Sequence, residues 1–213
     1  HLLRELDHRV KNNLANLFSL VSLYERQAND QAGLAELIRN KILALKRTHE
    51  ALAINQWSGL DMRRLVLAMA DAGTHWDNIE PRLQLDVPSL HVSLRQAPAL
   101  AMVFHELFSH SREFGALSSP TGKVTLEVHV IEPNHESTRV RLSWSEAGGS
   151  SVLGTSTHPH KGLAMIEGLT RFELSGSATF HSSDHGFSCT LVIRLDLPTS
   201  EQEAPEETAA IVS

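Results

Sequence analysis

Near the N-terminus, the stretch DHRVKNNL places reactive polar side chains on an amphipathic pattern. If Leu3 and Leu6 are taken as the a and d positions of a heptad, His8 falls at f, on the side away from the packed seam. An imidazole at f is exposed, free to react and reachable by a partner. Lys11 and Asn12 follow three and four residues later, close to His8 on a helix. Solvent-facing helix positions also carry polar residues without any function, and the spacing alone leaves that alternative open.

A second candidate lies where an apolar strand pattern ends in a carboxylate. Glu146 continues the alternation of Val140–Trp144, which points its side chain into the layer between sheet and helices. Burying a carboxylate is costly unless a donor reaches it. Glu146 therefore either binds a ligand or hydrogen-bonds the backbone at the strand end. The following Gly148 and Gly149 fit a turn on both interpretations.

A third set lies in the segment HELFSHSREFGAL. Glu106, His110 and Glu113 are spaced by four and three residues, which places them on one face of a helix. His110 and Glu113 could also form an internal pair with no ligand. The thirteen histidines show no spacing typical of a structural zinc site, so no metal site is predicted. The single cysteine, Cys189, excludes an internal disulfide and is predicted to lie in a strand core.

Two amphipathic helices joined by a turn are predicted to present the first of these sets. Two antiparallel helices cannot cover both of their apolar stripes, so dimerisation into a four-helix bundle is expected. The first seam comprises Leu3, Leu6, Val10, Asn13, Leu17, Leu20 and Tyr24, and the second comprises Leu34, Ile38, Ile42, Leu45, His49 and Leu52.

Beyond residue 59 the pattern changes to short alternating strands and separate helices, which indicates an α+β two-layer domain. The predicted organisation is a hairpin at 1–56, this domain at 60–198, and a disordered acidic tail at 199–213. Helices are predicted for Asp61–Ala72, Gln96–Leu117 and Gly162–Arg171, and strands for Arg82–Val87, Leu90–Ser93, Val124–Val130, Val140–Trp144, Ala178–His181 and Phe187–Leu195.

The composition excludes several classes of protein. The net charge is −6, and residues 197–213 carry four acids and no base, which leaves about −2 elsewhere and no basic excess for nucleic acid. No apolar run has membrane-spanning length and no signal peptide is present, so we expect a cytoplasmic segment without membrane contact. Because the chain begins at His1 within a helical pattern, it is expected to be part of a longer protein, with a possible sensor domain upstream.

The stretch Glu5–Leu14 resembles the phosphoacceptor motif of the HWE branch of bacterial two-component histidine kinases, which runs roughly E-L-x-H-R-x-K-N-N-L. The resemblance implies a homodimeric bundle on which His8 accepts a phosphoryl group and exchanges it with the receiver domain of a response regulator. A neutral imidazole is a competent nucleophile near pH 7. Asp7 would orient the ring or take its proton, Lys11 would screen charge, and Asn12 would orient water for dephosphorylating a partner.

Three further segments resemble the ATP-binding domain of the same family, an α/β sandwich that holds ATP and magnesium between its sheet and its helices. His105–Leu117 resembles H-E-L-x-x-N-A-x-K-Y-G-A-L, Trp144–Gly149 resembles W-x-E with two glycines, and His160–Glu167 resembles G-F-G-x-x-L-I-E. Glu146 would accept the adenine amino group, and Gly162 would let amides at a helix start approach phosphate. The nucleotide-binding residues implied are Glu106, His110, Glu146, Gly148, Gly149 and Gly162.

The departures from the family pattern fall where magnesium and the triphosphate would bind. His110 replaces an asparagine, and imidazole is a poor magnesium ligand. Glu113 replaces a lysine, and at roughly 5 Å and an effective dielectric of about 20 each charge pair is worth about 3 kcal/mol. His160 replaces a glycine and Lys161 a phenylalanine. Three functions remain open: an autokinase, an ATP-independent histidine phosphotransferase or phosphatase, and a pseudokinase scaffold that binds a response regulator.

Overall fold

The computed structural model describes residues 60–71, 79–133, 137–148, 161–183 and 186–196, together with four helical residues at 42, 46, 48 and 50. Lys46 and Glu50 form an exposed ion pair of 3.6 Å at i, i+4 spacing. Most of the hairpin predicted at 1–56 and all of the tail predicted at 199–213 lie outside the described residues. So do the candidate site residues Asp7, His8, Lys11, Asn12, Gly149 and His160.

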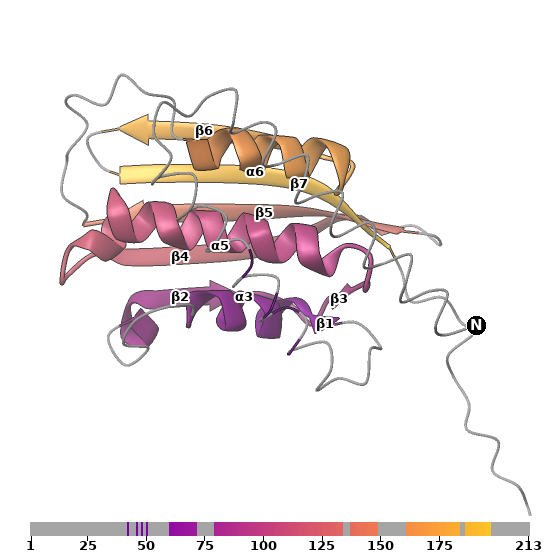
Figure 1. Ribbon diagram of the computed structural model, residues 1–213, viewed down its shortest axis with the longest axis horizontal. Coiled ribbons are helices and arrows are strands. Elements are labelled where there is room, and N and C mark those ends of the chain that lie inside the picture. The colour runs from indigo at the N-terminus through magenta and orange to yellow at the C-terminus, as the bar shows by residue number, and fades with distance from the viewer. Residues whose placement is uncertain are drawn as a thin grey trace, which may run out of the picture.

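A five-stranded sheet forms one layer of the domain, in the order β2-β4-β5-β7-β6 (Figure 1). β2 runs parallel to β4, and the other neighbours are antiparallel. A separate two-stranded sheet pairs β1 with β3. The strands are β1 (Leu60–Asp61), β2 (Leu83–Asp86), β3 (His91–Val92), β4 (Lys123–Pro133), β5 (Ser137–Ala147), β6 (Ser177–Ser183) and β7 (Gly186–Asp196).

The described helices lie on one side of the five-stranded sheet and form the second layer (Figure 1). They are α3 (Met62–Ala70), α5 (Ala97–Glu113) and α6 (Lys161–Phe172), with short 3-10 turns at Glu80–Arg82 and Ala116–Ser118. The α+β two-layer prediction is therefore confirmed. No helix among the described residues is long and apolar enough to cross a membrane.

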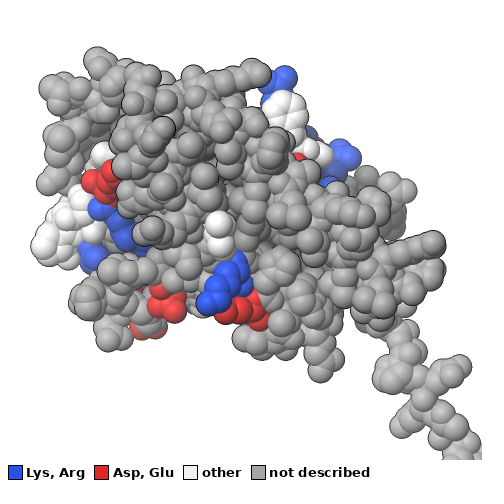
Figure 2. All heavy atoms as spheres, in the orientation of Figure 1, with Lys and Arg blue, Asp and Glu red and all other residues white. Residues whose placement is uncertain are grey.

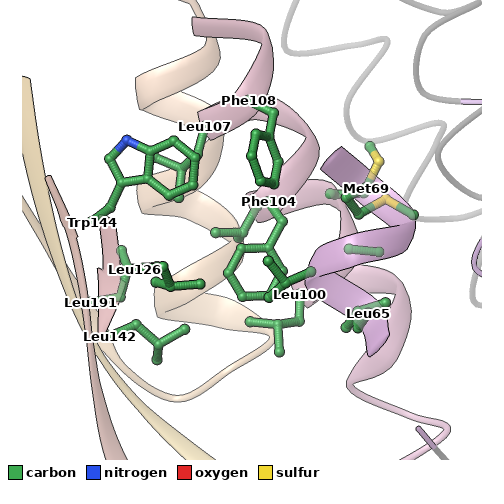
Figure 3. Packing of buried hydrophobic residues seen from close by; sticks show 14 of the residues in the cluster. Leu65, Met69, Leu100, Phe104, Leu107, Phe108, Leu126, Leu142, Trp144 and Leu191 are labelled. Carbon is green, nitrogen blue, oxygen red and sulfur yellow. The ribbon is translucent and has the colours of Figure 1, made fainter. Parts of the chain in front are cut away.

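The core lies between α5 and the sheet because both contribute continuous apolar faces. The even-numbered residues of β5 from Val140 to Glu146 are buried, and so are the odd-numbered residues of β7, as their alternation predicts. Phe108 of α5 meets Trp144 of β5 edge-to-face at 4.9 Å, an arrangement that aromatic rings prefer. Figure 3 shows α5 between the side chains of α3 and those of the strands, with Leu65, Met69, Leu100, Phe104, Leu107, Leu126, Leu142 and Leu191 also in this cluster.

Helix boundaries differ from the prediction where local hydrogen bonds intervene. The Asp61 carboxylate caps α3 as predicted, accepting from the Arg64 amide at 3.3 Å, but the helix ends at Ala70 rather than Ala72. The helix predicted to reach Leu117 ends at Glu113. Gly115 then adopts an extended ψ, which turns the chain into the 3-10 segment. The parallel pairing of β2 with β4 was not predicted.

Candidate functional site

Glu146 lies at the end of β5 with its carboxylate buried in the layer between sheet and helices. Its Oε1 accepts a 2.9 Å hydrogen bond from the indole Nε1 of Trp144. Its Oε2 accepts a 2.6 Å hydrogen bond from the backbone N–H of Ala116, and the Ser111 side chain also hydrogen-bonds the carboxylate. The inward orientation predicted from strand alternation is confirmed, and so is the expectation that donors must reach this group.

Burial raises the pKa of the Glu146 carboxyl above its ordinary value, because a charged carboxylate loses hydration there. The hydrogen bonds from Trp144, Ala116 and Ser111 act in the opposite direction and offset part of this increase. A carboxylate has about four lone-pair sites. Three donors therefore leave room for one more, so the group can still accept from an amino group of a ligand.

Two glycines allow the backbone to approach Glu146 closely. A Cβ added at Gly115 would overlap the carboxylate Oε2, and one added at Gly186 would overlap the Glu146 carbonyl oxygen. Gly186 has φ +137° and Gly148 has φ +76°, conformations that glycine adopts readily. A side chain at any of these positions would disturb the turn or displace the carboxylate.

Glu106 and Gly162 lie together where α5 meets the start of α6. A Cβ at Gly162 would lie 2.7 Å from Glu106 Oε2, so the absent side chain lets the carboxylate reach the first turn of α6. The other carboxylate oxygen, Oε1, is 3.3 Å from Nδ1 of the buried His105. The positive end of a helix dipole stabilises negative charge, so this position suits a carboxylate or another anion.

His110 lies one turn beyond Glu106 and belongs to an aromatic cluster. Its ring centroid is 4.3 Å from that of Phe187 on β7 and 5.8 Å from that of Phe114. Phe187 in turn stacks with Phe180 on β6, with centroids 6.4 Å apart. These contacts hold the imidazole against apolar rings. Glu113 is exposed at the last residue of α5.

The structure thus gathers Glu106, Glu146, His110 and Gly162 along the second half of α5, the end of β5 and the start of α6. Sequence reasoning did not assign a role to Ser111 or Gly115 at this site. Gly115–Leu117 matches the final G-A-L of the motif that His105–Leu117 resembles, and this match could have identified Gly115. Within the described ranges, no group of three or more His, Cys, Asp or Glu side chains is placed to hold a metal ion.

Comparisons with known proteins agree with this geometry. Residues 5–87 match the family model described as HWE histidine kinase. A blue-light-activated histidine kinase of Brucella ovis is 28% identical over 151 residues, covering 70% of this chain and 30% of that protein. The chain is therefore similar to HWE histidine kinases over its N-terminal part. A blue-light-activated histidine kinase of Brucella anthropi is 29% identical over 150 residues, with the same coverage.

Solved structures of histidine kinases share the fold of this chain. The blue-light activated histidine kinase of Erythrobacter litoralis EL346 matches 94% of the chain and 60% of its own, with TM-score 0.63 and 17% identity. Its separate histidine kinase domain matches with TM-score 0.60 and 18% identity, covering 94% of this chain and 92% of its own. The chain spans about 30% of the length of its curated relatives.

Proposed function

We propose that this chain carries a phosphoryl group on His8 and exchanges it with the receiver aspartate of a response regulator. The observation that carries the proposal is the family match over residues 5–87, which includes the complete phosphoacceptor motif at Glu5–Leu14. The homodimeric four-helix bundle expected for residues 1–56 would present the imidazole outward to the docking partner.

The exchange requires a nucleophile and a nearby proton acceptor. The lone pair of a neutral His8 ring nitrogen attacks the phosphorus of the aspartyl phosphate, forming a P–N bond as the P–O bond breaks. The aspartate leaves as a carboxylate, and the proton on the other ring nitrogen is released, for which Asp7 is the proposed acceptor. Asn12 is proposed to orient water when phosphate is removed from the partner instead.

The adenine end of the ATP site fits the side chains present. Glu146 retains one acceptor position, and it lies at the strand end where the family places its adenine contact. Gly148 and Gly149 would form the adjoining turn, and Glu106 and Gly162 adjoin the helix start that would face phosphate. Bound ATP would supply the phosphoryl group.

The magnesium end does not fit. Magnesium prefers oxygen ligands in octahedral geometry, and His110 offers an imidazole packed against Phe187. Glu113 adds negative charge at the end of the same helix, where the family has a lysine. We therefore propose that ATP-dependent autophosphorylation is weak or absent. An ATP-independent phosphotransferase or phosphatase is the form of the function favoured by these two residues.

Transfer from a phosphorylated receiver domain tests the central proposal. A 32P-labelled receiver should pass label to the intact chain as an acid-labile, alkali-stable phosphohistidine. His8→Ala should abolish the transfer, and His181→Ala, which removes an exposed histidine on β6, should leave it unchanged. A chain that binds the receiver but never acquires label, with or without His8, would be a scaffold, and the phosphotransfer proposal would be wrong.

A nucleotide titration separates the remaining alternatives. Labelled ATP with magnesium should give no label on His8 and at most weak adenine-dependent binding. Efficient labelling of His8 would make the chain an autokinase and overturn our interpretation of His110 and Glu113. Receiver transfer is measured without ATP. A negative result in one experiment therefore leaves the proposal tested by the other unaffected.

A further inference from the structure

The outer face of the five-stranded sheet, which points away from the helices, carries three exposed arginines at one end. Arg139 and Arg141 lie on β5 and Arg194 lies on β7, all at positions that alternate with the buried residues. The strand register places Arg139 directly opposite Arg194, and Arg141 opposite Val192. Like charges directly opposite each other on neighbouring strands destabilise a sheet. We call Arg139, Arg141 and Arg194 the arginine cluster.

The described acidic residues near the arginine cluster offset only a small part of its positive charge. Glu132 lies 3.8 Å from Arg139, but both side chains are more than half exposed. Asp196, two residues beyond Arg194, is held by Arg95 at 2.7 Å. Among the residues that the structure describes, neither Arg141 nor Arg194 has an ion-pair partner.

Charges beside the arginine cluster and on the helix-bearing face are mixed in sign. On the outer face, Glu127 is 3.9 Å from His129, the residue opposite Arg141. On the helix-bearing face, acidic and basic side chains are intermingled among the described residues (Figure 2). The arginine cluster is therefore an unbalanced positive patch that an anionic group would stabilise.

The sequence that follows β7 supplies such a group. Residues 197–213 contain Glu201, Glu203, Glu206 and Glu207, and no lysine, arginine or histidine. β7 ends at Asp196, so this segment begins beside the arginine cluster. Glu201 lies seven positions after Arg194 along the chain, which allows a span of up to roughly 24 Å. Arg141 lies two residues along β5 from Arg139, or about 7 Å, so the acidic segment can reach all three arginines.

We propose that residues 199–207 bind back onto the outer face of the sheet, with their glutamates paired to the arginine cluster. Guanidinium groups donate charge-assisted hydrogen bonds to carboxylates, often in bidentate geometry. A covalently attached segment has an effective concentration of the order of millimolar, which a separate acidic partner must exceed. Because exposed ion pairs are individually weak and screened by salt, this pairing should be reversible and should weaken as the salt concentration rises.

Disulfide trapping in the full chain tests the proposal. Val192→Cys places a thiol within the arginine cluster, Ala204→Cys places one in the acidic segment, and the native Cys189 is buried. Under mild oxidation the double variant should close an intramolecular disulfide. Changing all three arginines to glutamine should slow closure about tenfold, as should raising the salt concentration, because both remove the charge attraction that raises the effective concentration.

Two further measurements define the outcome. The control pair combines Ala204→Cys with Ser188→Cys, which lies on the same face at the other end of β7. Its disulfide should form more slowly than that of the Val192→Cys pair.

Limited proteolysis is the second measurement. A glutamate-specific protease should cleave after Glu201 and Glu203 more slowly in the chain without added cysteines than in the triple-glutamine variant. Closure and cleavage rates that do not change with the arginines would overturn the proposal. A disulfide that forms only between chains would assign the patch to a second copy instead.

Discussion

The backbone N–H of Ala116 donates a 2.6 Å hydrogen bond to Glu146 Oε2, which joins the segment after α5 to the end of β5. The preceding residue, Gly115, approaches the same oxygen so closely that a Cβ would overlap it. The carboxylate that is proposed to contact adenine therefore also fixes the local backbone. Changes at either residue are expected to alter stability and ligand binding together.

Gly115→Ala should destabilise the domain by about 2 kcal/mol, because the added methyl group must displace the Glu146 carboxylate or the Ser111 backbone. Urea unfolding monitored by circular dichroism measures this change. Gly168→Ala is the matched control, since Gly168 lies within α6 and nothing approaches its Cβ within 4 Å. That control should stabilise the domain by roughly 0.5–1 kcal/mol through helix propensity. Equal effects of the two substitutions would contradict the close packing at Gly115.

Glu146→Gln should remove a pH dependence of stability. Because burial raises the pKa of the Glu146 carboxyl, the folded state binds more protons than the unfolded state between pH 4.5 and the higher folded pKa. The contribution of this group to stability is therefore complete below pH 4.5 and is lost as the pH rises through the folded pKa. Free energies of unfolding measured across this range should fall for the wild type relative to Glu146→Gln.

Glu146→Gln should also lower the free energy of unfolding for a second reason. A glutamine amide presents one acceptor and one donor, so its NH2 group would face the N–H of either Trp144 or Ala116. A buried donor left unsatisfied costs about 1–3 kcal/mol, which should appear at a pH where the wild-type carboxylate is ionised. Stability curves that stay parallel at every pH would show that Glu146 has the same pKa in both states.

Restoring the family residues at the magnesium end should raise ATP affinity. In His110→Asn with Glu113→Lys, an oxygen ligand replaces imidazole and an attraction replaces a repulsion. We expect at least about tenfold tighter binding, or about 1.4 kcal/mol, measured by calorimetry with ATP and magnesium. Glu80→Lys makes the same charge change on the exposed turn at Glu80–Arg82 and should have little effect. If both changes raise affinity equally, net charge rather than site chemistry is responsible.

Cys189 should be almost inert to thiol reagents until the domain unfolds. Burial raises the pKa of the Cys189 thiol from 9.0 to about 12, so at pH 8 roughly one thiol in ten thousand is ionised. Labelling followed by mass spectrometry should track global unfolding. Ser145→Cys on the exposed face of β5 should label rapidly in the folded protein. Fast labelling of Cys189 under native conditions would indicate local opening of β7.

The apolar periodicity predicted most of the described fold. The faces of β5 and β7 are buried as their alternation indicated, and the inward direction of Glu146 followed from the same parity. The Asp61 cap was recognisable because a carboxylate before an amphipathic run satisfies free helix amides.

Contacts between segments distant in sequence were not predictable in this way. The parallel pairing of β2 with β4 depends on tertiary packing, and the four residues of β2 carry no signal of direction. The tilted ring contact between His110 and Phe187 joins residues of α5 and β7, which no local pattern brings together. Donors to Glu146 were expected, but their identity follows only from the turn at Gly115.

The position of β7 in the sheet has a consequence for synthesis on the ribosome. β7 is the last described strand along the chain, yet it lies between β5 and β6. It is also fastened to the start of α5, since the Gln96 side chain bonds the Arg194 carbonyl at 2.7 Å and the Asp196 amide at 2.9 Å. A nascent chain that has not yet released residue 196 therefore exposes an open edge of β5. We therefore expect this domain to complete its fold during synthesis only after β7 has been released. Until then, we expect chaperones to bind the unpaired strands.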